Sequence, residues 1–228
     1  MDELDASVVI DFPLRGEWSV ERTPAHRVPS HGTDVLGQRF AYDLVRTDHR
    51  HGSHLNPAGT LRFYLIGGRT RDCYGWGQPA YAAFDGEIVK AVDGMPEREW
   101  LHVLRESYLA LKSSIRLARG KLDPVLLAGN HVIIRAGETY ALYAHLAPGS
   151  VGVRPGQVVR TGELIGRVGH TGNSTAPHLH LQLMDSGDPL KARGIPCAFA
   201  EYLVQRDGRW ERVERGIPGR LERIRSVS

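Results

Sequence analysis

The chain has 228 residues, of which 41% are hydrophobic and 24% charged, with a formal net charge of +3. This composition is ordinary for a folded globular protein, and the length allows one large domain or one domain with insertions. It excludes a low-complexity chain. No apolar run reaches about 18 residues, so we expect no membrane span.

The two ends of the chain bear on location and partners. The N-terminus, Met1–Asp5, is acidic and lacks the basic and apolar regions of a secretory signal, so we expect either a cytoplasmic protein or a trimmed exported one. Acidic residues interrupt the basic C-terminal tail, which we therefore interpret as a solvated face, with no nucleic-acid partner. Cys73 and Cys197 lie far apart in sequence, and we expect them to be reduced.

Short apolar runs bounded by turn residues predict strands in the first part of the chain. They lie at 8–10, 40–45, 79–83 and 87–92. Between the second and third of them, the polar stretch 46–59 is predicted to be an exposed loop. From Pro96 to Arg119 the pattern changes, because apolar residues recur at spacings of three and four, as in an amphipathic helix.

Strand signals resume beyond Gly120, at 131–135, 139–146, 164–168 and 178–183. Short, regularly spaced strands are typical of a small antiparallel β-barrel or sandwich. We therefore predict a mainly β fold in a single domain over 1–228. A helical insertion at 94–121 interrupts it, and a C-terminal extension follows at 186–228.

The most informative run is His178-Leu179-His180-Leu181-Gln182-Leu183. Strand side chains alternate between faces, so the leucines suit a core while the two histidines and Gln182 share the other face. A further histidine, His145, lies in the apolar run 143–146, and Asp43 lies in the apolar run 40–44. Alone, His145 is also compatible with a core or surface histidine, and Asp43 with a salt bridge at a strand end.

The order of these motifs resembles the lysostaphin/LytM-type zinc endopeptidases, which cut peptide cross-links of bacterial cell walls. The resemblance is specific from about 127 to 184 and looser back to 40–45. It rests on Asn130–Ile134, Tyr143–Leu146, Val153–Val159, Gly162–Gly166 and Gly169–His180. It implies the LytM-like fold, a duplicated hybrid motif, and it does not cover the helical insertion or the tail.

The resemblance also implies roles for individual residues. His180 corresponds to a zinc ligand, Asp43 to the metal-binding aspartate, and His145 and His178 to the two catalytic histidines. The family's first zinc histidine precedes the aspartate by four residues, but Arg39 stands there, and a guanidinium cannot bind zinc. We expect His31, in a loop, to supply this ligand, with His26 as second choice.

The resulting hypothesis is a Zn²⁺ endopeptidase acting on peptidoglycan peptides as a monomer. A zinc-bound water has its pKa lowered toward about 7, and His145 and His178 would orient or deprotonate it and bind the developing oxyanion. Tyr143 is expected on the face of His145, where it would either contact the substrate or serve in packing. Thr171 and Asn173 are expected on a loop that rims the cleft, and these three are the predicted substrate contacts.

Two other functions are compatible with the sequence. A catalytically inactive binding or regulatory module would explain the missing histidine at position 39. A phosphocarrier-like barrel would also use two close histidines, but it needs neither Asp43 nor a metal.

Overall fold

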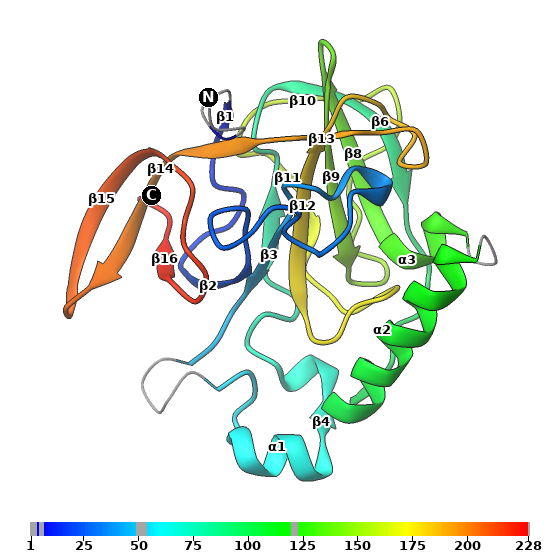
Figure 1. Cartoon of the computed structure of the whole chain (residues 1–228), viewed down its shortest axis with the longest axis vertical. Coiled ribbons are helices and arrows are strands. Elements are labelled where there is room, and N and C mark those ends of the chain that lie inside the picture. The colour runs from blue at the N-terminus through cyan, green and yellow to red at the C-terminus, as the bar shows by residue number, and fades with distance from the viewer. Residues whose placement is uncertain (1–3, 5–6, 49–53, 120–122, 228) are drawn as a thin grey trace.

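The computed structural model describes residue 4 and residues 7–48, 54–119 and 123–227, in which one large mixed sheet is accompanied by a few short helices (Figure 1). The helices are α1 (Thr60–Ile66), α2 (Val103–Ala118) and α3 (Pro124–Ala128), with 3-10 turns η1 (Val35–Gly37) and η2 (Thr70–Asp72). The strands are β1 (Val8–Ile10), β2 (Glu17–Arg22), β3 (Tyr42–Val45), β4 (Gly68–Arg69), β5 (Pro79–Tyr81), β6 (Gly86–Val92), β7 (Trp100–Leu101), β8 (Asn130–Ala136), β9 (Thr139–Leu146), β10 (Val158–Val159), β11 (Leu164–Arg167), β12 (His178–Met184), β13 (Gly194–Ile195), β14 (Cys197–Arg206), β15 (Arg209–Gly216) and β16 (Arg223–Arg225).

The main sheet has the strand order β1-β14-β16-β2-β3-β12-β9-β8-β6-β10, with β13 added to β12 and β15 to β14. β1 runs parallel to β14, whereas the other pairings described in this sheet are antiparallel. The sheet is therefore mixed, and not purely antiparallel as the sequence predicted. Its centre is β3-β12-β9, where strands distant in sequence become neighbours.

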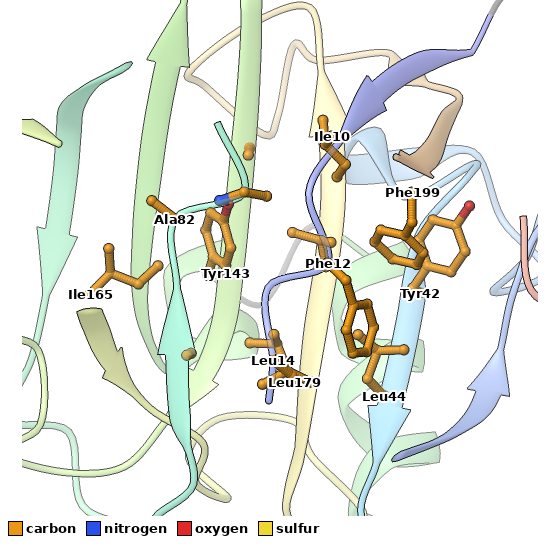
Figure 2. Close-up of a cluster of buried hydrophobic side chains, with 14 of the residues drawn as sticks. Ile10, Phe12, Leu14, Tyr42, Leu44, Ala82, Tyr143, Ile165, Leu179 and Phe199 are labelled. Carbon is orange, nitrogen blue, oxygen red and sulfur yellow. Dashed lines mark hydrogen bonds between the residues drawn. The ribbon is translucent and has the colours of Figure 1, made fainter. Parts of the chain in front are cut away.

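The alternation predicted for the histidine strand is confirmed. Leu179, Leu181 and Leu183 are fully or almost fully buried in the main core. Around them pack aromatic and aliphatic side chains from β3, β9, β14 and the segment after β1, and Figure 2 shows Phe12, Tyr42 and Phe199 gathered together. Burying such side chains contributes about 1.5–3 kcal/mol each, which fixes which face of β12 points away from the core.

The helix expected between Pro96 and Arg119 is present but begins later, at Val103, after the short strand β7. The short helices α1 and α3 were not predicted, because each is too brief to show a helical period. The C-terminal segment forms the hairpin β14-β15 and strand β16 beside β2. No helix in the described parts of the chain is long and apolar enough to cross a membrane. Cys73 and Cys197 are both free, as expected, and both are buried.

Candidate active site

The pairing of β12 with β3 and β9 brings the predicted polar residues together. His180 is opposite Asp43 on β3 and opposite Ala144 on β9, next to His145. The imidazole rings of His145 and His178 lie 4.8 Å apart between centroids, and those of His145 and His180 lie 5.8 Å apart. Sheet register thus gathers residues separated by more than 130 positions, on the face opposite the leucine core.

His31 reaches this cluster from the loop between β2 and β3. Its Nε2 lies 3.0 Å from Oδ2 of Asp43, and its ring is 4.9 Å from that of His180. The loop is closed by a backbone hydrogen bond from Ser30 N–H to Arg39 O, 2.8 Å. Arg39 itself pairs with Asp34, 2.8 Å away. His26 does not line the pocket. Of the two candidate histidines, His31 is therefore the one beside Asp43.

Asp43 is the electrostatic centre of the cluster. Its Oδ1 lies 2.9 Å from His180 Nδ1 and 3.4 Å from His178 Nε2, and its Oδ2 also lies 3.4 Å from Arg22 Nε. Burial alone would raise the pKa of this carboxyl, but the imidazoles of His31 and His178 hold the pKa well below its usual range. Asp43 is therefore a carboxylate surrounded by side-chain nitrogen atoms.

The hydrogen bonds of His180 leave a place for a cation. Gln182 Oε1 lies 2.8 Å from His180 Nε2 and, as an amide oxygen, can only accept, while Gln182 Nε2 donates to Leu36 O. The proton of a neutral His180 is thus on Nε2, so the lone pair of Nδ1 faces the carboxylate of Asp43. Two acceptors 2.9 Å apart need a proton or a metal ion between them.

A similar arrangement holds for His31. Ser30 Oγ donates to Gln38 O, so it can accept a hydrogen bond from His31 Nδ1 at 3.0 Å and leave the Nε2 lone pair toward Asp43. The nitrogens of His31 and His180 and an oxygen of Asp43 lie within 4.8 Å of one another. Two imidazoles and a carboxylate are a donor set that catalytic zinc accepts, with one position left open.

His145, His178 and His180 form a second group in which one ring nitrogen from each residue lies within 4.8 Å of the others. His145 has a left-handed backbone, with φ 65°, and its Nδ1 lies 2.9 Å from Thr171 O. A carbonyl oxygen can only accept, so Nδ1 carries the proton and Nε2 has the lone pair. Burial lowers the pKa of His145 well below its usual value, with His178 and His180 adding to the effect. His145 is therefore neutral at ordinary pH.

His178 is held by the loop that precedes β12. Its Nδ1 lies 2.7 Å from Ala176 O and 3.2 Å from Ser174 Oγ, so Nε2 points to the cluster. Burial would lower the pKa of His178, but the carboxylate of Asp43 outweighs this and raises the pKa. The two histidines expected to be catalytic are thus adjacent and oriented, one favouring the neutral and one the protonated form.

The cluster lies in a cleft of about 840 Å³. Of the three predicted substrate contacts, Asn173 lines this cleft, whereas Tyr143 and Thr171 do not. Tyr143 is buried in the core, where its hydroxyl accepts from Ala83 N–H at 2.8 Å. The prediction that Tyr143 shares a face with His145 is wrong, because the left-handed backbone at His145 interrupts the strand alternation. The side chain of Thr171 is also buried, bonded to Asn130 N–H and Leu146 O.

Sequence reasoning missed a polar network beside the loop that precedes β12, centred on the buried side chains of Glu106 and His170. Arg98 Nε donates to the fully buried Glu106 on α2 at 2.5 Å, and Arg98 also donates to the carbonyl oxygens of Gly172 and Ser174. His170 Nδ1 lies 2.9 Å from Ser174 Oγ, the hydroxyl that contacts His178. The one available signal was Glu106, a carboxylate placed among apolar residues in a helical pattern.

Comparison with known proteins bears directly on this geometry. The model of "Peptidase family M23" matches residues 117–192, which contain His145, His178 and His180. Residues 117–192 belong to peptidase family M23. His31 and Asp43 lie outside this M23 segment, and the fold brings them to its histidines.

Two curated relatives match over a similar length. The peptidoglycan DD-endopeptidase ShyA of Vibrio cholerae is 46% identical over 89 residues, which cover 35% of this chain and 20% of ShyA. The DD-carboxypeptidase/endopeptidase Mpg of Neisseria meningitidis serogroup B is 42% identical over 80 residues, covering 35% of this chain and 18% of Mpg. The matched part thus spans about a fifth of these relatives.

Among solved structures, the catalytic domain of the M23 protein EnpA from Enterococcus faecalis superposes with a TM-score of 0.42 and 16% identity, over 78% of this chain and 88% of that domain. The catalytic domain of lysostaphin from Staphylococcus simulans gives 0.38 and 19%, over 79% and 88%. Both scores lie below 0.5, so the fold is defined by the strand pairing of the chain itself and not by these likenesses.

Proposed function

We propose that this protein is a zinc-dependent endopeptidase that hydrolyses peptide bonds in the cross-links of bacterial peptidoglycan. The observation that carries the proposal is the position of Asp43, between His31 and His180 and beside His178, in the cleft that His145 also lines. The M23 segment and the names of its relatives support the reaction and the substrate class.

His31, Asp43 and His180 are the proposed zinc ligands. Their donor atoms are close together, and Gln182 and Ser30 orient the two imidazoles from behind, as partners of metal-binding histidines do. This choice leaves the Nε2 atoms of His145 and His178 free to act on the substrate. When bound, zinc supplies a Lewis acid that polarises a carbonyl and lowers the pKa of water.

The remaining steps use the chain's own residues. His145 is neutral, with its Nε2 lone pair available, so it accepts the proton of the attacking water. His178, whose ring is fixed through Nδ1 by Ala176 O, offers an Nε2–H hydrogen bond to the oxygen that gains charge during attack on the peptide carbonyl. Asn173, at the rim of the cleft, is a proposed contact of the peptide backbone.

The Arg98–Glu106–His170 network gives the inserted helix a part in this site. By donating to Gly172 O and Ser174 O, Arg98 fixes the loop whose Thr171 and Ala176 carbonyls orient the two catalytic histidines. We propose the division made from the sequence: a LytM-like catalytic domain, a helical insertion over 94–121 that supports the loop, and a C-terminal extension from 186, with the protein acting as a monomer.

The test is digestion of purified peptidoglycan by the full chain, before and after removal of metal and after reloading with Zn²⁺. We expect soluble muropeptides from the zinc-loaded protein alone. His178→Ala should abolish turnover and keep zinc, whereas His180→Ala should lose zinc. Equal zinc loss in both variants contradicts the proposed division of roles, and intact peptidoglycan with the zinc-loaded protein contradicts the function.

A further inference from the structure

Helix α2 turns its apolar side to solvent. Leu104, Tyr108, Leu111 and Ile115 follow one another at spacings of four, three and four, which places them on one side of the helix. Their exposed fractions are 71%, 62%, 61% and 44%. Large apolar side chains that line up on an exposed helix face mark an interaction site more often than scattered ones do.

The ion pairs of Glu106 keep the apolar stripe, which consists of the four residues just named, facing solvent. Glu106 points the opposite way from Leu104, is 0% exposed, and is paired with Arg98 and Arg105. Rolling α2 to bury the apolar stripe would pull the carboxylate away from these partners. Half-buried Ala110, which lines the catalytic cleft, also lies away from the stripe. The exposed stripe and the cleft therefore occupy different sides of α2.

A second apolar group extends the stripe. Helix α1 exposes Leu61, Leu65 and Ile66, and Trp100 is exposed just before α2. Trp100 Nε1 donates to Ile66 O, and His102 Nε2 lies 3.2 Å from Leu65 O, so these hydrogen bonds connect the end of α1 to the start of α2. Figure 1 shows α1 at the lower end of the molecule and α2 running upward from beside it. We call this set of exposed residues the α1–α2 face.

The charges beside the α1–α2 face have one predominant sign. The exposed charged side chains described on α2 are Arg105, Lys112 and Arg116, with Arg119 directly after the helix and Arg62 on α1. Glu99, next to Trp100, is an exposed acidic neighbour. A helix with Leu, Ile and Tyr on one side and Lys and Arg along the edge is typical of segments that lie in the interface of an anionic membrane.

We propose that the α1–α2 face docks on an anionic phospholipid surface, with the apolar side chains in the interface and the basic residues at the headgroups. A second copy of the chain fits less well, since a symmetric contact would oppose the same basic edges. The proposal does not depend on the peptidase reaction, because its residues are separate from the five that form the site.

Vesicle flotation of the full chain tests it, with phosphatidylcholine vesicles compared with vesicles that also contain phosphatidylglycerol. We expect binding to the anionic vesicles only, and release by salt. Leu104→Gln/Leu111→Gln should weaken binding by about tenfold or more, because two apolar anchors are removed. Lys112→Gln/Arg116→Gln should do the same, because each basic residue near the surface adds about one kcal/mol, or about fivefold.

Matched control variants carry the same changes elsewhere on the surface. Val158→Gln/Leu221→Gln and Arg154→Gln/Arg160→Gln replace exposed residues away from α1 and α2 and should bind like the wild type. Circular dichroism checks that each variant is folded. Absence of binding to anionic vesicles, or unchanged binding of the leucine variant, overturns the proposal. So does a dimer in sedimentation that only the leucine variant loses, since this would assign the face to a second copy.

Discussion

Replacing His31 by alanine distinguishes the two metal sites that the cluster offers. If zinc is held by His31, Asp43 and His180, the change removes one of three protein ligands; if it is held by His145, His178 and His180, it removes none. A zinc site supplies about 10–16 kcal/mol, so one of three ligands accounts for about 3–5 kcal/mol. At about 1.4 kcal/mol per tenfold, we therefore expect His31→Ala to raise the zinc Kd by about 10²–10⁴-fold.

The matched control is His145→Ala, which removes an imidazole from the same cleft and should leave the zinc Kd nearly unchanged. Both constants can be measured by competition with a chromophoric chelator, alongside elemental analysis of the purified proteins. His31 is in a loop and belongs to none of the apolar core clusters, so its removal leaves the core intact. Retention of zinc by His31→Ala together with its loss from His145→Ala would refute our ligand assignment.

Three further predictions concern the support of the site. Gln182→Ala removes the acceptor of His180 Nε2–H and should weaken zinc binding by about 10–100-fold in the chelator assay; an unchanged Kd would exclude this role. Tyr143→Phe leaves the buried Ala83 N–H without its acceptor and should lower the free energy of unfolding by about 1–3 kcal/mol in a denaturant titration, with turnover preserved. Loss of turnover at unchanged stability would instead show that Tyr143 acts in the site. The pKa of Glu106 is lowered to about 2. Burial alone would raise this pKa, but the hydrogen bonds with His170 and Arg105, together with the charge of Arg98, outweigh the effect of burial. Its stabilising contribution, about 3 kcal/mol, is therefore complete above pH about 4.5 and lost as the pH falls toward 2. The free energy of unfolding of Glu106→Gln should therefore depend less on pH in this window than that of the wild type. An equal dependence in both proteins would contradict the stabilising role of the Glu106 carboxylate.

The sequence predicted the face of β12 correctly because leucines alternate with polar residues along this strand, which is buried on both faces. Leu179, Leu181 and Leu183 had to lie together in the core, so the histidines between them had to share the other face. Asp43 was found for a similar reason, as a carboxylate inside an apolar strand. Local patterns of this kind are sufficient to assign side chains to one face of a strand wherever the chain keeps a regular period.

One prediction failed and two features were missed where the backbone or the tertiary environment departs from the local sequence pattern. Tyr143 was assigned to the wrong face, since nothing local signals the left-handed conformation of His145. The stripe of α2 is exposed although its period is that of a core-facing helix, because the buried ion pairs of Glu106 determine which side of α2 packs inward. The contact of Arg98 with the loop before β12 spans more than 70 residues and leaves no trace in local sequence.

The central claim is peptide-bond hydrolysis in a cross-link by a zinc site in this cleft. The most direct measurement is mass spectrometry of a purified, peptide-cross-linked muropeptide dimer incubated with the zinc-loaded protein in ¹⁸O-labelled water. Our account predicts conversion of the dimer to two monomers, with one ¹⁸O atom in the new carboxylate, and no conversion by His178→Ala. A dimer that stays intact in the presence of fully zinc-loaded wild-type protein would contradict it.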